Sequence, residues 1–269
     1  MMTAQQGRLF VDECSALPLG PAARCARWGV DLLEEIPVPG LATAVDWGGC
    51  APGTTDYPGR NHPGMGAWLW EKYRPAVGTT AADPMIGVGG LWLQTDAFVL
   101  GCDVCSDAVK LAEQNLEQYG FLDVAPAETW RPDPPSSPYR IPLAMFSPIY
   151  QQSHSSGASE HQQEIRREKR AAAVQQFEAR FPDMRKVYAN VGSWIAPGGV
   201  MIVILRNRIE NGRERDEIAD HVRMMRETGW VVAGAHPRDL ERPTLFQQWK
   251  VARDPETPWI RWEWAIVAR

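Results

Sequence analysis

The sequence predicts an α/β fold in which a mostly parallel β-sheet ends in an antiparallel hairpin at its C-terminal edge. From Tyr73 onward, short runs of strand-forming residues alternate with segments of helical periodicity, which is the pattern of parallel α/β folds. Turns rich in glycine and proline separate these runs. The last two strand-like runs have no long helix between them, which favours an antiparallel pair at the edge of the sheet.

Each predicted element has a local reason. The segment 106–119 is amphipathic, because Val109, Ala112 and Leu116 recur at helical spacing and Ser106 suits an N-cap. Gly229 suits the end of a helix that leads into a strand. The predicted strands are 79–83, 98–103, 141–146, 200–205, 230–235 and 259–267. The predicted helices are 21–35, 67–73, 106–119 and 214–228.

Length and composition exclude several classes of protein. At 269 residues and 44% hydrophobic residues, the chain can bury one large core, with or without a small appendage. No apolar stretch approaches the ~20 residues that span a bilayer, and the N-terminus lacks a signal-peptide core, so we expect a cytoplasmic protein without membrane contact. Five cysteines without framework spacing fit a reducing compartment. The net charge of −5 means that any contact with phosphates must come from a local patch.

The chain divides into an N-terminal extension, 1–56, to which we assign no chemistry, and a domain that covers 57–269. Within the domain, 151–186 is predicted to be a polar and basic insertion, and its first part suits a loop that orders on substrate. The basic residues of its second part are Arg166, Arg167, Lys169, Arg170, Arg180, Arg185 and Lys186. A second cluster after a later strand comprises Arg206, Arg208, Arg213 and Arg215. Both clusters are either solvated surface or, because they follow strand ends, contacts for phosphates.

A glycine turn follows the first predicted strand, with the sequence Asp83-Pro84-Met85-Ile86-Gly87-Val88-Gly89-Gly90. Gly87 and Gly89 allow a sharp bend and a close approach of a ligand to the backbone. A dinucleotide fingerprint would need glycine at the position of Trp92, so that reading fails. Asp103 ends the next predicted strand, where an acidic side chain can accept ribose hydroxyls. The two features together predict a nucleotide-like cofactor.

A second motif, Ser147-Pro148-Ile149-Tyr150, follows the predicted strand 141–146. An exocyclic amine on a base is a poor nucleophile, because its lone pair is delocalised into the ring. Acceptors near its hydrogens, here the Ser147 hydroxyl and the Pro148 carbonyl, would favour a pyramidal nitrogen. Tyr150 would stack on a base rotated out of a duplex, since the amine cannot be reached inside it. Seen alone, the tetrapeptide would indicate a strand that ends in a proline turn; its place after the glycine turn and Asp103 favours a clamp for a base amine.

These motifs, in this order, resemble those of the SAM-dependent amino-methyltransferases of DNA bases, where SAM is S-adenosylmethionine. The signatures of that family are a D-P-x-x-G-S-G-T turn and an S-P-P-Y or N-P-P-Y tetrapeptide; the chain departs from them at Ile149 and at Val88-Gly89-Gly90. The resemblance implies a Rossmann-like class I SAM methyltransferase fold and SAM as cofactor. The implied catalytic residues are Ser147, Pro148 and Tyr150. The implied SAM-binding residues are His62, Pro63, Met65, Asp83, Pro84, Gly87, Gly89, Asp103, Val104, Glu128 and Phe146.

The resemblance also implies a reaction, the methylation of an exocyclic base amine in DNA after base flipping. Serine at the first position of the clamp favours N4 of cytosine over N6 of adenine. The alternatives are an adenine enzyme, an RNA base amine as substrate, or an inactive nucleic-acid-binding protein on the same scaffold. DNA or RNA is the expected partner, and sequence specificity would come from 151–186, from 1–56, or from another chain, either a second copy or a specificity partner.

Two weaker patterns do not predict further chemistry. Cys102 and Cys105 match a redox C-x-x-C motif, but such motifs open a helix and Cys102 falls within a predicted strand. His154 and His161 lie in a polar segment without cysteines or carboxylates that would complete a set of metal ligands. We therefore predict no metal site.

Overall fold

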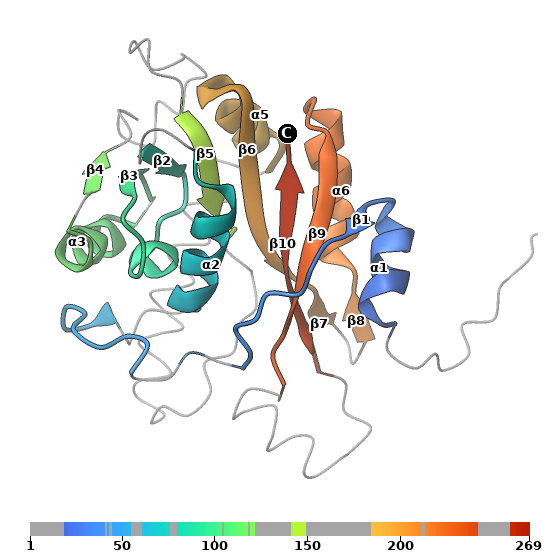
Figure 1. The fold of residues 1–269 in the computed structure, drawn as a ribbon, viewed down its shortest axis with the longest axis horizontal. Helices are drawn as coiled ribbons and strands as arrows, with labels where there is room; N and C mark the ends of the chain where they lie inside the picture. Colours follow the sequence, from blue (N-terminus) through green and yellow to red (C-terminus); the bar gives the residue numbers. More distant parts are fainter. Residues whose placement is uncertain are drawn as a thin grey trace, which may run out of the picture.

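The computed structural model describes residues 19–40, 42, 45–54, 61–75, 80–103, 105–117, 119–121, 141–148, 184–210, 213–241 and 259–269. Within these ranges the main feature is an eight-stranded sheet with the order β1-β9-β10-β6-β5-β2-β3-β4 (Figure 1). Its strands are β1 (Asp31–Leu32), β2 (Thr80–Asp83), β3 (Phe98–Gly101), β4 (Tyr119–Phe121), β5 (Ile141–Phe146), β6 (Ile195–Arg206), β9 (Val232–Asp239) and β10 (Trp262–Ala268).

The directions of the strands confirm the predicted fold class. β10 runs antiparallel to its neighbours β6 and β9, whereas the other described pairings of this sheet are parallel. This order, with the antiparallel last strand inserted beside the strand that precedes it, is that of the Rossmann-like class I SAM methyltransferase fold. The short strand β1 pairs with the outer side of β9, so the C-terminal hairpin does not form the outermost edge.

Two helices end earlier than the sequence predicts. α1 (Pro21–Trp28) stops at Gly29, which adopts a left-handed conformation with φ of 64°, so the chain turns into β1 before the predicted end at residue 35. α3 (Ser106–Asn115) stops because Leu116 is extended, and β4 follows. Ser106 is the first helical residue rather than the cap, since Cys105 occupies the N-cap position.

α6 (Glu217–Glu227) begins at Glu217 rather than at Glu214. The residues before it form a separate antiparallel pair, β7 (Arg208–Glu210) with β8 (Arg213–Arg215). Asp216 then caps the helix, accepting a hydrogen bond from the Ala219 amide at 3.2 Å. Two other helices also differ from expectation: α2 (Pro63–Tyr73) begins before residue 67, and α5 (Met184–Trp194) was not identified from the sequence.

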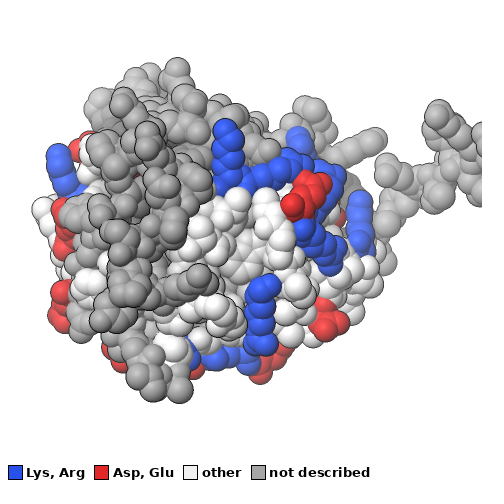
Figure 2. Space-filling model, turned by 90° about the horizontal axis from the view of Figure 1, so that it is seen from above, with Lys and Arg blue, Asp and Glu red and all other residues white. Residues whose placement is uncertain are grey.

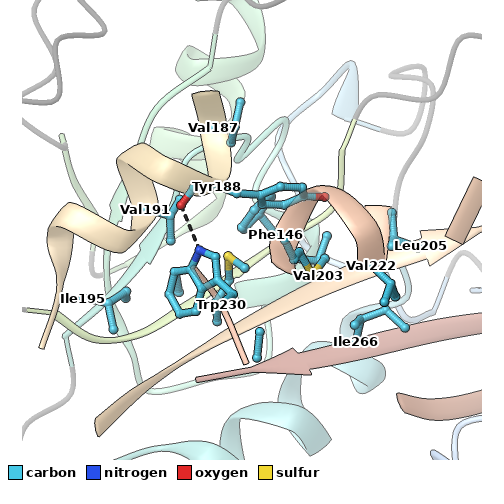
Figure 3. Close-up of a cluster of buried hydrophobic side chains, with 14 of the residues drawn as sticks. Phe146, Val187, Tyr188, Val191, Ile195, Val203, Leu205, Val222, Trp230 and Ile266 are labelled. Carbon is cyan, nitrogen blue, oxygen red and sulfur yellow. Dashed lines mark hydrogen bonds between the residues drawn. The ribbon is translucent and has the colours of Figure 1, made fainter. Parts of the chain in front are cut away.

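Hydrophobic clusters cover both faces of the sheet. On one face, α5, α6 and α1 enclose Phe146, Tyr188 and Trp230 (Figure 3). The Trp230 indole N–H donates to the Tyr188 carbonyl at 3.0 Å, so its one polar atom is paired inside the core. On the other face, α2 contributes Leu69 and Trp70, which are almost fully buried. This two-sided cover is what a parallel sheet requires.

The connection from β2 to β3 holds no α-helix in residues 84–97, all of which the structure describes. A short 3₁₀ helix, η2 (Gly90–Trp92), takes its place, and α2 packs against it. The approach is close, because a Cβ atom on Gly66 would lie 1.7 Å from the Leu91 carbonyl oxygen. The rings of Trp70 and Trp92 meet edge to face with centroids 6.2 Å apart. α2, the helix before β2, thus takes the place that a crossover helix between β2 and β3 would occupy.

None of the described helices is both long and apolar enough to cross a bilayer. Figure 2 views the end of the sheet toward which β10 points, and Lys and Arg side chains gather mainly on one side of that end. The parallel strands finish at the opposite end, where the predicted site residues lie. The charges visible in Figure 2 are therefore not part of the candidate site.

Candidate functional site

Three adjacent strands bring the main predicted motifs to one edge of the sheet. β3, β2 and β5 are parallel neighbours, and their carboxyl ends lead to Asp103, to the turn that starts at Asp83, and to Ser147. Ligands of open α/β sheets bind at this edge. The fold therefore places the predicted cofactor turn between the predicted ribose acceptor and the predicted clamp.

Asp83 fastens the start of the glycine turn. Its side chain is 1% exposed and accepts hydrogen bonds from the Met85 amide at 2.9 Å and from the Trp92 indole N–H at 2.7 Å. Burial raises the pKa of this carboxyl group to about 7, against the opposing effect of the two bonds. Trp92, which at the sequence level only excluded a dinucleotide fingerprint, thus has a structural role that no motif indicated.

The glycine turn has the backbone that the sequence predicts. Gly87 and Gly89 adopt φ values of 55° and 82°, in the left-handed region that favours glycine. Asp103, partly buried beyond β3, accepts from the Gly87 amide at 2.9 Å and from the Cys105 amide at 2.9 Å. Its position just beyond β3 fits an acceptor for ribose hydroxyls, and its bonds to the two amides hold the turn.

Residues 45–54 of the predicted extension pack against this turn. The Asn115 side chain accepts from the Ala51 amide at 2.7 Å and donates to the Val88 carbonyl at 3.1 Å, so one side chain joins both segments. A Cβ atom on Gly90 would lie 2.6 Å from the Trp47 ring. This contact between the extension and the predicted cofactor turn has no motif in the sequence.

The predicted pre-strand motif forms the start of α2. His62 is the N-cap, and its Nδ1 atom accepts from the Gly64 amide at 3.1 Å. Desolvation and the nearby Arg238 lower the pKa of His62, while its Nε2 atom lies 3.9 Å from an oxygen of Asp46. Pro63 is buried and Met65 is fully buried in the core. The described contacts give these residues the role of positioning α2.

Ser147 lies just beyond β5 and is partly buried. Its hydroxyl donates to the Ile204 carbonyl at 3.3 Å. A hydroxyl that gives its hydrogen to a carbonyl keeps its oxygen lone pairs as acceptors, which is what the predicted clamp needs. Pro148 is buried beside it, and Phe146 is fully buried against Tyr188.

Several predicted residues lie outside the described ranges. They are Val104, Glu128, Ile149, Tyr150, His154, His161 and residues 151–183 of the predicted insertion. The structure therefore describes only Ser147 and Pro148 of the predicted clamp. In the glycine turn, Pro84 is described and buried.

An ionic network that the sequence did not indicate lies at the same edge of the sheet. Glu263 on β10 stands opposite Arg206 on β6 and Arg238 on β9. It accepts from Arg206 Nε at 2.6 Å and from Arg238, whose remaining N–H groups donate to the carbonyls of Val38 and Gly40. The network joins the end of β6 to the N-terminal segment.

The two cysteines near the site do not have the features of a redox pair. Burial, followed by the nearby Asp103 and Asp83 charges, raises the pKa of the Cys102 thiol well above its ordinary value. Its Sγ atom donates to the Pro84 carbonyl at 3.4 Å. A reactive cysteine has a lowered pKa instead. Among the described residues, no group of three or more His, Cys, Asp or Glu side chains could hold a metal ion.

No protein-family model and no curated protein matches the sequence. The chain is similar to the structure of precorrin 8w decarboxylase from Methanobacterium thermoautotrophicum, with 13% identity, a TM-score of 0.45, and 86% of this chain and 99% of that chain covered. It is also similar to ribosomal protein L11 methylase from Lactobacillus delbrueckii subsp. bulgaricus, with 13% identity, a TM-score of 0.44, and coverages of 82% and 83%. At these low scores the fold assignment rests on the strand order of the chain itself.

Proposed function

We propose that this chain methylates an exocyclic base amine in DNA with SAM as methyl donor, and that the amine is N4 of cytosine. The supporting observation is the order of the three strand ends: Asp103, the glycine turn from Asp83, and Ser147 stand side by side at one edge. A cofactor along the first two would present its reactive end toward the third.

In this proposal the bound SAM supplies an electrophilic methyl group, and the residues of the chain position the amine. Ser147, whose hydrogen is donated to Ile204, accepts one amine N–H, and the Pro148 carbonyl accepts the other. These bonds hold the nitrogen pyramidal and direct its lone pair at the methyl carbon. Tyr150, outside the described residues, would hold the extruded base by stacking, worth about 1–3 kcal/mol.

The reaction is tested with isotopically labelled SAM and duplex DNA, followed by mass spectrometry of the digested nucleosides. We expect N4-methylcytosine from the wild type and a fall of about 10²-fold or more in turnover for Ser147→Ala, with SAM affinity retained. Ser193→Ala is the matched control, because that hydroxyl donates to the Asn190 carbonyl within α5. Full activity of Ser147→Ala would contradict the clamp mechanism. If the product is N6-methyladenine, the target base is adenine rather than cytosine. If label enters RNA but not DNA, the substrate is RNA.

The cofactor assignment is tested separately by calorimetry. Asp103→Ala should weaken SAM binding by about 1–3 kcal/mol, since it removes hydrogen bonds to a charged acceptor. Asp107→Ala is the control, because Asp107 is an exposed acid in the first turn of α3, paired only loosely with Lys110 at 3.7 Å. Equal SAM affinity of the two folded variants would remove Asp103 from the cofactor site.

A further inference from the structure

Asn115, the last residue of α3, joins the glycine turn to residues 45–54 with its whole side-chain amide. Its Oδ1 atom accepts from the Ala51 amide at 2.7 Å and from the Thr54 hydroxyl at 3.4 Å. Its Nδ2 atom donates to the Thr54 hydroxyl at 2.9 Å and to the Val88 carbonyl at 3.1 Å. Because a backbone N–H only donates and a carbonyl only accepts, Ala51 and Val88 fix the orientation of the amide. A carboxylate or an ammonium group could not serve both partners.

The bond to Val88 holds a peptide unit that glycine would otherwise leave adaptable. The unit between Val88 and Gly89 is fixed at both ends, because its carbonyl accepts from Asn115 and its amide donates to the Ile86 carbonyl at 2.9 Å. Gly89 has φ of 82°, and glycine adopts either sign of φ at little steric cost. Without Asn115 the carbonyl of this unit would be able to turn. The side chain therefore selects one of the conformations that the glycine turn can adopt.

The 45–54 segment, drawn in light blue in Figure 1, also contacts the turn directly. A Cβ atom on Gly90 would lie 2.6 Å from the Trp47 ring. Trp47 and Thr54 are buried, whereas the residues between them are exposed or partly exposed. The buried side chains of the segment are thus the ones that meet the turn or Asn115.

We propose that Asn115 is a positioning residue for the cofactor, and that the 45–54 segment is the part of the chain against which it holds the glycine turn. This inference rests on the proposed function, since SAM is there the ligand of the turn. A turn that already has its binding conformation loses less conformational freedom when the ligand binds, which strengthens binding. The segment thereby supports SAM binding from outside the domain that carries the motifs.

The first test measures SAM affinity by calorimetry, without a methyl acceptor. Asn115→Ala removes the bridge, and we expect SAM to bind about tenfold more weakly, the effect of losing one or two hydrogen bonds. Thr54→Val keeps the shape of the side chain and removes its described bonds, which are to Asn115 alone. We expect about threefold weaker SAM binding from this variant, because Ala51 is then the remaining partner of Asn115 on the segment.

Gln114→Ala is the matched control, because Gln114 carries the neighbouring amide side chain of α3 and is exposed. It should keep the SAM affinity of the wild type. Equal SAM affinities of folded Asn115→Ala and Gln114→Ala would overturn the role of Asn115. Wild-type affinity of Thr54→Val would overturn the part of the 45–54 segment. In the methylation assay, Asn115→Ala should raise the KM for SAM and retain kcat at saturating SAM; a lower kcat with an unchanged KM would contradict a positioning role.

The second test measures amide hydrogen exchange in peptides that cover 45–54, with and without SAM. Linkage requires that SAM stabilise the attachment of the segment as much as the segment favours SAM. We therefore expect saturating SAM to slow exchange in the wild type and in Gln114→Ala, and to slow it much less in Asn115→Ala. Exchange in the wild type that does not respond to SAM would overturn the coupling.

The proposed function and this inference can fail separately, because calorimetry and hydrogen exchange use SAM alone. If the wild type binds SAM and transfers no methyl group to DNA, weaker SAM binding by Asn115→Ala still supports the positioning role. If DNA is methylated and Asn115→Ala binds SAM as the wild type does, the inference is overturned and the proposed function stands. A wild type that does not bind SAM overturns both.

Discussion

Asp83 is a carboxyl group enclosed at the point where β2 becomes the glycine turn. Its two accepted hydrogen bonds favour the charged form, yet the loss of water around it has the larger effect and raises its pKa from 3.8 to about 7. The folded chain therefore binds this proton more tightly than the unfolded chain does. The contribution of protonated Asp83 to the free energy of unfolding is fully present below about pH 4 and is lost as the pH rises through about 7.

The free energy of unfolding should accordingly carry a contribution that decreases between about pH 4 and about pH 8. Asp83→Asn removes the titration, so we expect a flatter pH dependence over this window, whatever the variant costs in absolute stability. Urea unfolding at a series of pH values measures the slope. Asp107→Asn, an exposed acid, should leave the slope of the wild type unchanged. Parallel curves for Asp83→Asn and the wild type would show that Asp83 does not titrate in this range.

At the scale of elements, the contact between α2 and η2 sets the conformation of the chain after the glycine turn. Gly66 lets the helix approach the Leu91 carbonyl so closely that a Cβ atom would lie 1.7 Å from its oxygen. The clashing atom is backbone, so no rotamer change relieves it. Because Leu91 follows the glycine turn directly, a displacement of α2 would also move the predicted cofactor turn.

Gly66→Ala should therefore destabilise the protein and weaken SAM binding together. Gly192→Ala is the matched control, since Gly192 also lies in a helix and its added Cβ atom would be 3.7 Å from the Trp230 ring, an ordinary contact. That control should gain up to about 1 kcal/mol from the higher helix propensity of alanine. Thermal melting and calorimetry with SAM measure both effects. A Gly66→Ala protein as stable as the control would contradict the close packing of α2 on η2.

Elements were predictable where their signal is local. The glycine turn and the alternation of strands and helices both depend on residues close in sequence. The sequence therefore predicted the fold class and the left-handed φ values of Gly87 and Gly89 correctly. The start of α6 was predicted wrongly because a tertiary contact decides it: Glu214 bonds to Arg24 of α1 instead of starting the helix. The bond from Trp92 to Asp83 also depends on the folded chain, and no pattern encodes it.

At the scale of the whole molecule, a buried ionic network joins distant parts of the chain. Glu263 and Arg238 have side chains only 1% exposed, and Arg206 is 30% exposed. Burial acts to raise the pKa of Glu263. The charges of Arg206 and Arg238 and their hydrogen bonds outweigh this effect, so the pKa of Glu263 lies below its ordinary value. The carboxylate thus contributes stability above its unfolded pKa, and this contribution is lost as the pH falls. Arg238 extends the network to the backbone at Val38 and Gly40.

Removing the acid of this network alone should destabilise the protein at least as much as removing the acid together with Arg238. Glu263→Met leaves Arg238 charged and buried without its acid, and such changes cost about 3–5 kcal/mol. Adding Arg238→Met removes the stranded charge, so the double variant should be no less stable than Glu263→Met alone. The exposed pair Arg223 and Asp220, 2.7 Å apart, provides the control cycle, with an expected coupling of about 0–1 kcal/mol. Urea unfolding of both sets measures the coupling. Additive effects at Glu263 and Arg238 would mean that the network does not hold the N-terminal segment to the sheet as a unit.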